Sequence, residues 1–269
     1  MISLEAIRSF FPAQLRDNRL FDKYMLKEYI QLLMLDFLSS TPYIRKITLI
    51  GGTCLRLVKG IDRFSEDLDF DCKDFSKDEF TIMTDRVHQF LQRNGLPVEV
   101  RDRENSRLTA FRRNFHFPGL LFDLGLTGHD EERFLIKIES QDQMVDYQPK
   151  LVNIRGCGIF FPMPVPPDPV LCAMKLTAML ERQKGRDFYD VMFLLDQTAP
   201  DYSFLSQRIG ITSPEELKKA VSKMLEKVDL KNKMRDFEHL LFNRDNNKRI
   251  LHAREFFSEL PRSVAPSIQ

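Results

Sequence analysis

The 269-residue chain lacks the features that most directly mark nucleic-acid-binding and membrane proteins. It has no excess of charge: 40 Lys and Arg stand against 39 Asp and Glu, for a net charge of +1. Any binding of nucleic acid must therefore use local basic patches. It also has no apolar run long enough to cross a bilayer and no signal peptide. We expect a protein of the cytoplasm without a membrane contact.

Zinc-site and disulfide patterns are also missing. The four cysteines show neither paired-ligand spacing nor a disulfide framework, and the five histidines are scattered. Cys54, Cys72 and Cys172 have apolar neighbours and are expected to be reduced core residues. The chain is 43% hydrophobic and 29% charged, which suits one large globular domain or two modest ones.

Hydrophobic periodicity divides the chain into an α/β half and a helical half. In the first half, three- and four-residue steps predict a helix over 15–39 and another capped by Ser76. Strands are predicted over 46–50, 98–101, 109–117, 120–126 and 134–140. The proline-rich segment 161–169 can be neither helix nor central strand, and we expect a linker there. We therefore predict an α/β domain over 1–161 and a helical domain over 162–269.

The most informative stretch is a glycine turn followed by alternating carboxylates. Gly51 and Gly52 end an apolar strand and precede Thr53, and such a turn at a helix start presents backbone N–H groups to an anion. Asp67 and Asp69 follow, and residues two apart in a strand point to the same face. Two carboxylates side by side repel each other unless a cation lies between them, and Mg²⁺ is usual where phosphate oxygens complete the ligand set. The stretch predicts a site for a metal–nucleotide complex.

This first block resembles the first motif of the AbiEii-type nucleotidyltransferases, the toxins of type IV toxin–antitoxin systems within the polymerase-beta-like superfamily. Two further blocks extend the resemblance over about 47–195. It implies an α+β fold in which a mixed sheet flanked by helices is followed by a helical half. It also implies that Asp67 and Asp69 bind Mg²⁺ or Mn²⁺. The implied phosphate contacts of the NTP are Gly51, Gly52, Thr53, Arg63 and Ser65.

The second block is the predicted strand 134–140, in which Lys137 and Glu139 lie on the face opposite to the apolar residues. Two-metal nucleotidyl transfer needs a third carboxylate on a neighbouring strand, and the resemblance implies an acidic residue here. Glu139 is the candidate third metal ligand, and Lys137 is a candidate nucleotide contact. Asp123, in the predicted strand 120–126, competes with Glu139 for this role. The alternative is that Lys137 and Glu139 belong to a solvated strand face and have no role in catalysis.

The third block begins at Lys175, seven residues before Arg182, so that the two share one face of a helix. It resembles the family segment Lys-x-x-Ala-x-x-x-Arg-x-x-x-Arg-Asp. The resemblance implies that Lys175, Arg182 and Arg186 bind the triphosphate. It also implies that Asp187 belongs to the active site, either orienting a cation or lying near the nucleophile. We expect Asp190 to form a structural salt bridge instead.

Together these features favour a metal-dependent nucleotidyltransferase that moves an NMP from an NTP to a hydroxyl. The resemblance, and not the spacing, implies an RNA acceptor such as the 3′ end of tRNA and a cognate antitoxin as partner. The alternatives are nucleotidylation of a protein hydroxyl and a regulator that binds nucleotide without turnover. Two basic clusters are candidate RNA contacts, although charge rows are usually solvated faces. The first comprises Lys219, Lys223, Lys227, Lys231, Lys233 and Arg235, and the second Arg101, Arg103, Arg107, Arg112 and Arg113.

Overall fold

The computed structural model describes residues 3–101 and 110–260, which form two compact units. Unit 1 takes the described residues within 1–60, 64–143 and 150–165. Unit 2 takes those within 61–63, 144–149 and 166–269. Two short segments of the predicted α/β domain, 61–63 and 144–149, are therefore part of the helical unit.

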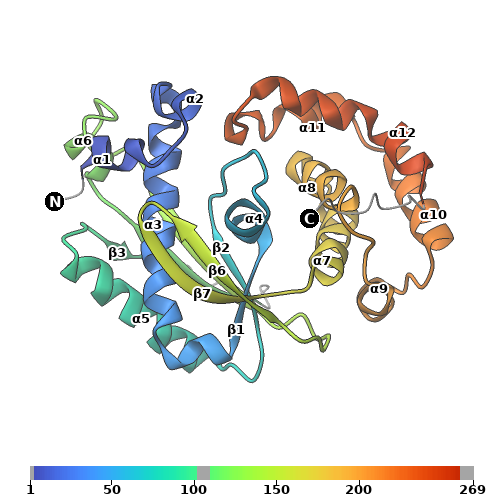
Figure 1. Ribbon diagram of the computed structural model, residues 1–269, viewed down its shortest axis with the longest axis horizontal. Coiled ribbons are helices and arrows are strands. Elements are labelled where there is room, and N and C mark those ends of the chain that lie inside the picture. Colours follow the sequence, from blue (N-terminus) through green and yellow to red (C-terminus); the bar gives the residue numbers. More distant parts are fainter. Residues whose placement is uncertain (1–2, 102–109, 261–269) are drawn as a thin grey trace. The chain divides into compact units, whose positions relative to one another are not determined.

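Unit 1 is built on a five-stranded sheet of order β1-β2-β5-β4-β3 (Figure 1). Its strands are β1 (Ile47–Ile50), β2 (Leu68–Cys72), β3 (Glu99–Val100), β4 (Phe111–His116) and β5 (Leu135–Gln141). The pair β2 and β5 is parallel, and the other neighbouring pairs are antiparallel. Along β2, Leu68 and Phe70 are buried whereas Asp69 is half-buried, as a period of two requires. The predicted α+β class and mixed sheet are confirmed.

Helix α5 covers the face of the sheet that carries the apolar residues. It starts at a capping box in which Ser76 and Glu79 each accept a hydrogen bond from the other's backbone N–H. Its Phe80 ring lies 5.6 Å from the ring of Phe111 on β4. Because the next residue, Arg112, points to the other side of β4, that second face is the polar one. The helical elements of unit 1 are α1 (Leu4–Ser9), α2 (Ala13–Arg16), η1 (Arg19–Phe21), α3 (Asp22–Ser39), η2 (Pro42–Arg45), α4 (Gly51–Cys54), η3 (Leu55–Lys59), α5 (Lys77–Arg93) and α6 (Leu120–Asp123).

Three sequence predictions about unit 1 are wrong in part. The predicted helix over 15–39 is divided into α2, η1 and α3. The predicted strand 120–126 is the helix α6, because Gly119 in a left-handed conformation (φ 69°) turns the chain out of the sheet. The expected linker 161–169 overlaps strand β7 (Ile159–Val165), which pairs with β6 (Lys150–Gly156), a strand that the periodicity did not reveal. Prolines are tolerated there because both strands of a two-stranded sheet are edges.

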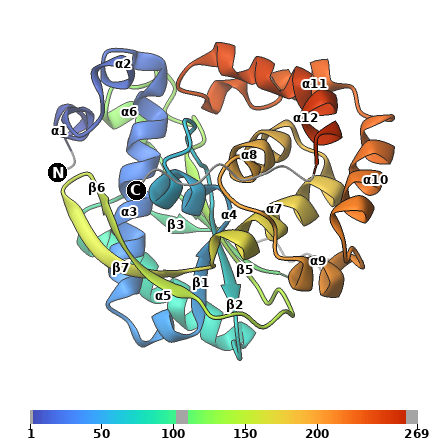
Figure 2. The same cartoon turned by 45° about the vertical axis from the view of Figure 1, so that its right-hand side comes forward.

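Unit 2 is helical, as predicted for the second half. Helix α7 packs against α8 and α9, and α10, α11 and α12 lie around the α7–α8 pair (Figures 1 and 2). Between α7 and α8, Gln183 adopts a left-handed conformation (φ 51°) that ends the first helix. The helical elements are α7 (Asp168–Arg182), α8 (Gly185–Leu195), α9 (Tyr202–Ile209), α10 (Pro214–Leu225), α11 (Leu230–Arg235), η4 (Glu238–Leu240), η5 (Arg244–His252) and α12 (Ala253–Ser258).

The state of the cysteines agrees with the prediction from the sequence. All four cysteines lie in the described part of the chain and none forms a disulfide bond, and Cys54, Cys72 and Cys172 are buried, as predicted. Burial raises the pKa of the Cys172 thiol, which keeps it protonated and unreactive at neutral pH. Within residues 3–101 and 110–260, no helix has both the length and the apolar character needed to span a membrane.

Candidate active site

Strand β1 runs directly into a turn that requires glycine. Gly51 has φ +75°, and a Cβ on it would lie 2.2 Å from Oδ2 of Asp69, so a side chain would displace this carboxylate. Helix α4 begins at the same residue. Two residues further, Thr53 Oγ1 donates a hydrogen bond of 2.5 Å to the backbone oxygen of Asp67. The glycine turn and the aspartate pair are therefore fixed against each other.

Strand register brings Glu139 beside Asp69. The two residues are direct partners in the parallel pairing of β2 and β5, and Glu139 is in turn paired with Arg112 of β4. Directly paired residues point to the same face of a sheet. Asp123, the competing candidate, is exposed on α6 and does not belong to any strand of this face. The register favours Glu139 over Asp123 as the third carboxylate.

The ammonium group of Lys137 lies between two of these acids. Its Nζ is 3.0 Å from Oδ2 of Asp67 and 3.2 Å from Oε1 of Glu139. The same Oε1 is 2.8 Å from Nε of Arg112. Burial lowers the pKa of Lys137, but the charges and hydrogen bonds of Asp67 and Glu139 outweigh this and leave the pKa above its ordinary value. Lys137 is thus fully charged at neutral pH and neutralises part of the acidic face.

Lys27 on α3 is a neighbour of this face that the sequence reasoning missed. Its side chain is 9% exposed, and its Nζ lies 3.9 Å from Oε1 of Glu66. It also lies 5.7 Å from the centre of the Phe134 ring. Burial lowers the pKa of Lys27, and Glu66 and Asp67 offset this only in part. The signal available in the sequence was a charged residue inside an otherwise apolar helical stripe.

The carboxylates suit a hard divalent cation. Among the described residues, no three His, Cys, Asp or Glu side chains lie in position to bind one ion. Asp67 and Asp69 nevertheless share one face beside Gly51, which has no side chain to displace Asp69, and carboxylate oxygens are preferred ligands of Mg²⁺ and Mn²⁺. This pair fits a cation that takes its other ligands from phosphate and water. Glu139 is already engaged by Lys137 and Arg112.

In unit 2, predicted site residues form a buried ion-pair network around Asp190. Arg63 donates from Nε and Nη2 to the two carboxylate oxygens, each at 2.7 Å. Lys175 Nζ donates to Oδ2 at 2.8 Å. Burial by itself would raise the pKa of Asp190, but the two cations outweigh it and lower the pKa to about 2. The predicted structural salt bridge of Asp190 is confirmed. Arg63, expected at the phosphates, has this carboxylate as a partner.

Asp187 both caps helix α8 and holds Arg182. Its carboxylate accepts a hydrogen bond from the backbone N–H of Lys184 at 3.1 Å. It also accepts two from the Arg182 guanidinium, at 3.1 Å from Nε and 2.9 Å from Nη2. The side chain of Arg182 is 47% exposed, and Arg186 is half-buried. Lys175 and Arg182, expected in one cationic row, lie on α7 but pair with different carboxylates.

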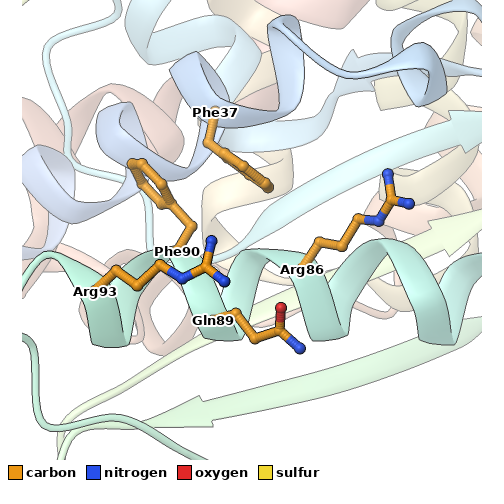
Figure 3. A pocket seen from close by; sticks show the side chains of 5 residues that line it. All are labelled: Phe37, Arg86, Gln89, Phe90 and Arg93. Carbon is orange, nitrogen blue, oxygen red and sulfur yellow. The ribbon is translucent and has the colours of Figure 1, made fainter.

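A shallow pocket between α3 and α5 contains none of the predicted site residues (Figure 3). Phe37 of α3 stacks on Phe90 of α5, with ring centres 4.6 Å apart, and three polar side chains of α5 complete the lining. These are Arg86, Gln89 and Arg93. Since α5 covers the face of the sheet opposite to Asp69 and Glu139, we do not assign the chemistry to this pocket.

The family of nucleotidyl transferase AbiEii toxins of type IV toxin–antitoxin systems matches residues 32–253. This range includes both the carboxylate face of unit 1 and the ion-pair network of unit 2. The chain belongs to the AbiEii family. The protein is therefore a nucleotidyltransferase, and the resemblance noted in its sequence is confirmed.

Solved structures of other proteins share this fold. The nucleotidyltransferase toxin MenT4 of Mycobacterium tuberculosis H37Rv is 16% identical, with a TM-score of 0.59 over 97% of this chain and 91% of its own. JHP933 of Helicobacter pylori is 19% identical, with a TM-score of 0.52 over 87% of this chain and 90% of its own. At these identities the similarity shows the fold alone. A comparison with curated proteins finds no match to the sequence.

Proposed function

We propose that this AbiEii nucleotidyltransferase transfers an NMP from an NTP to a hydroxyl of RNA, at the 3′ end of a tRNA, and that a cognate antitoxin opposes it. The observation that carries the proposal is the position of Asp69, held against Gly51 and paired in register with Glu139. In the reaction, the acceptor oxygen forms a bond to the α-phosphorus. The bond from the α-phosphorus to the bridging oxygen breaks, and pyrophosphate leaves. NTPs and tRNA are cytoplasmic, and we expect the protein to act there.

The proposed roles follow from charge and position. Asp67 and Asp69 hold Mg²⁺ or Mn²⁺, which supplies charge stabilisation to the phosphate oxygens when bound, and Glu139 completes the acidic site. The turn of Gly51, Gly52 and Thr53, together with Ser65, contacts the phosphates. The protein's contribution is positioning and charge neutralisation rather than covalent chemistry.

The cations of unit 2 are proposed to neutralise the triphosphate. Lys175 is assigned to this role by the family segment that it begins, and its pairing with the buried carboxylate of Asp190 fixes the position of its ammonium. Asp187 orients the guanidinium of Arg182 through two hydrogen bonds, which supports its role as a positioning residue. Arg186 is assigned to the same group.

The RNA acceptor is supported by one of the two basic clusters. Lys219 and Lys223 are exposed on successive turns of α10, and Lys227 is exposed just after the end of this helix. None of the three forms an ion pair within the described part of the chain. Such a row suits a phosphate backbone. The arginine cluster is different, because its described members are paired: Arg101 with Glu99, Arg112 with Glu139 and Arg113 with Asp85. Arg103 and Arg107 lie outside the described residues.

Labelling with each radioactive NTP in the presence of total RNA and cell protein tests the proposal. We expect label in RNA, dependent on Mg²⁺ or Mn²⁺, and no label with Asp69→Asn. The matched control is Asp123→Asn, which removes an exposed carboxylate of unit 1 outside the acidic face and should leave labelling unchanged. Label in protein instead of RNA would identify a protein acceptor, and NTP binding without any label would identify a regulator. Near-wild-type labelling by Asp69→Asn in Mg²⁺ would refute the metal assignment.

A further inference from the structure

Lys137 stands where a cation is expected. Its ammonium bridges Asp67 Oδ2 and Glu139 Oε1 at 3.0 and 3.2 Å, on the face that also carries Asp69. The bridging geometry is that of a counter-ion shared by two carboxylates. Lys137 reaches this position because it precedes Glu139 by two residues on β5, and two-residue steps return to the same face.

We propose that Lys137 is a built-in counter-ion of the acidic site, and that its ammonium competes with the divalent cation for the oxygens of Asp67 and Glu139. This inference rests on the metal site of the proposed function. It explains why no three described acidic side chains surround a common point, since the ammonium occupies the space between two of them. Glu139 can join Asp67 and Asp69 around one ion only when Lys137 withdraws.

Partial burial makes this competition effective. The side chains of Asp67, Lys137 and Glu139 are 21%, 25% and 24% exposed, so water screens their interaction less than at a fully exposed pair. Two other cations of the described chain pair differently: Arg112 contacts Glu139, and Lys27 contacts Glu66.

The proposal predicts two results for Lys137→Met. This substitution keeps an apolar side chain of similar length and removes the charge. Without metal, the variant should have a lower Tm than the wild type, because the repulsion among the carboxylates is no longer offset. With Mg²⁺ or Mn²⁺, it should bind the ion about 10-fold more tightly, because no internal cation has to be displaced. The rise in Tm on adding the ion should be correspondingly larger.

Titration calorimetry and thermal unfolding with Mg²⁺ and Mn²⁺, without NTP or RNA, provide the test. Lys46→Met is the matched control: Lys46 pairs with Glu79 at 2.6 Å on α5, which covers the opposite face of the sheet. It should leave the affinity for the ions unchanged. Lys137→Arg keeps the charge and should bind the ions no more tightly than the wild type, which provides a second readout if Lys137→Met does not fold.

The outcomes separate this inference from the proposed function. Ion binding that Asp69→Asn abolishes, but that Lys137→Met leaves at wild-type affinity, overturns the counter-ion role and leaves the metal site standing. Tighter binding by Lys137→Arg overturns it equally. A wild-type protein that binds neither ion in an Asp69-dependent way overturns the metal site itself, and the inference with it. Tighter binding by Lys137→Met, together with a lower metal-free Tm, supports both.

Discussion

The contact between Gly51 and Asp69 can be tested by two glycine-to-alanine variants of the same unit. Both Gly51 and Gly60 have left-handed backbones, with φ of +75° and +70°. A Cβ at position 51 would lie 2.2 Å from Oδ2 of Asp69, whereas at position 60 it meets no atom within 4 Å. The pair therefore separates the cost of the backbone conformation from the cost of intruding on the carboxylate.

The expected magnitudes follow from these two contributions. Alanine in a left-handed conformation costs about 1–2 kcal/mol relative to glycine, and this should be the whole effect of Gly60→Ala. Gly51→Ala carries the same cost plus roughly 1–3 kcal/mol for overpacking, because the turn or Asp69 must move. We expect Gly51→Ala to reduce the free energy of unfolding by about 2–5 kcal/mol in total.

Urea unfolding and nucleotidyl transfer, measured on both variants, form the assay. Gly51→Ala should also lose transfer activity by about 10²-fold or more, because a displaced Asp69 no longer matches the geometry of the transition state. Gly60→Ala should keep near-wild-type activity. If the two variants lose the same stability and keep the same activity, then Asp69 does not lie against the turn, and the site geometry is wrong.

The remaining predictions concern unit 2. Asp190→Asn should reduce the free energy of unfolding by about 3–5 kcal/mol, because it leaves buried cations without their carboxylate; a loss below about 1 kcal/mol in urea unfolding would contradict the network. Since the folded pKa of Asp190 is lowered to about 2, its ionisation stabilises the protein above the ordinary aspartate pKa of about 4, and this contribution is lost as the pH falls towards 2. Asp190→Asn should show a weaker acid dependence than the wild type over that window. Lys175→Ala should lower transfer by about 10²-fold or more, and Lys175→Arg should not restore it fully; unchanged NTP binding and turnover in Lys175→Ala would refute its role at the triphosphate. Charge reversal at Lys219, Lys223 and Lys227 should weaken RNA binding without altering NTP affinity, and should make the log–log salt slope less negative by about 0.7 for each lost contact. Unchanged RNA labelling would remove this row from the acceptor site.

Local patterns in the sequence determined most of the elements and the polar face of the sheet. Period-two alternation in β2 and β5 placed Asp69 and Glu139 opposite the buried residues, and Ser76 marked the start of α5. These features depend on residues a few positions apart, and the physics of caps and pleated strands is local. The strand prediction for 120–126 was wrong because it used local pattern alone. A short apolar segment can form a helix or a strand, and its tertiary surroundings determine which one forms.

Only the tertiary structure decided which distant groups meet. The register of β2 on β5 pairs Asp69 with Glu139, 70 positions later, and so favours Glu139 over Asp123. Arg63 belongs to unit 2, where it pairs with Asp190, 127 positions later in the chain. Such contacts depend on how whole elements pack, which no periodicity along the chain encodes. The sequence therefore determined which chemical groups are present and on which face they lie. Packing over long separations decided that Gly51 holds Asp69 and that Lys137 bridges Asp67 and Glu139.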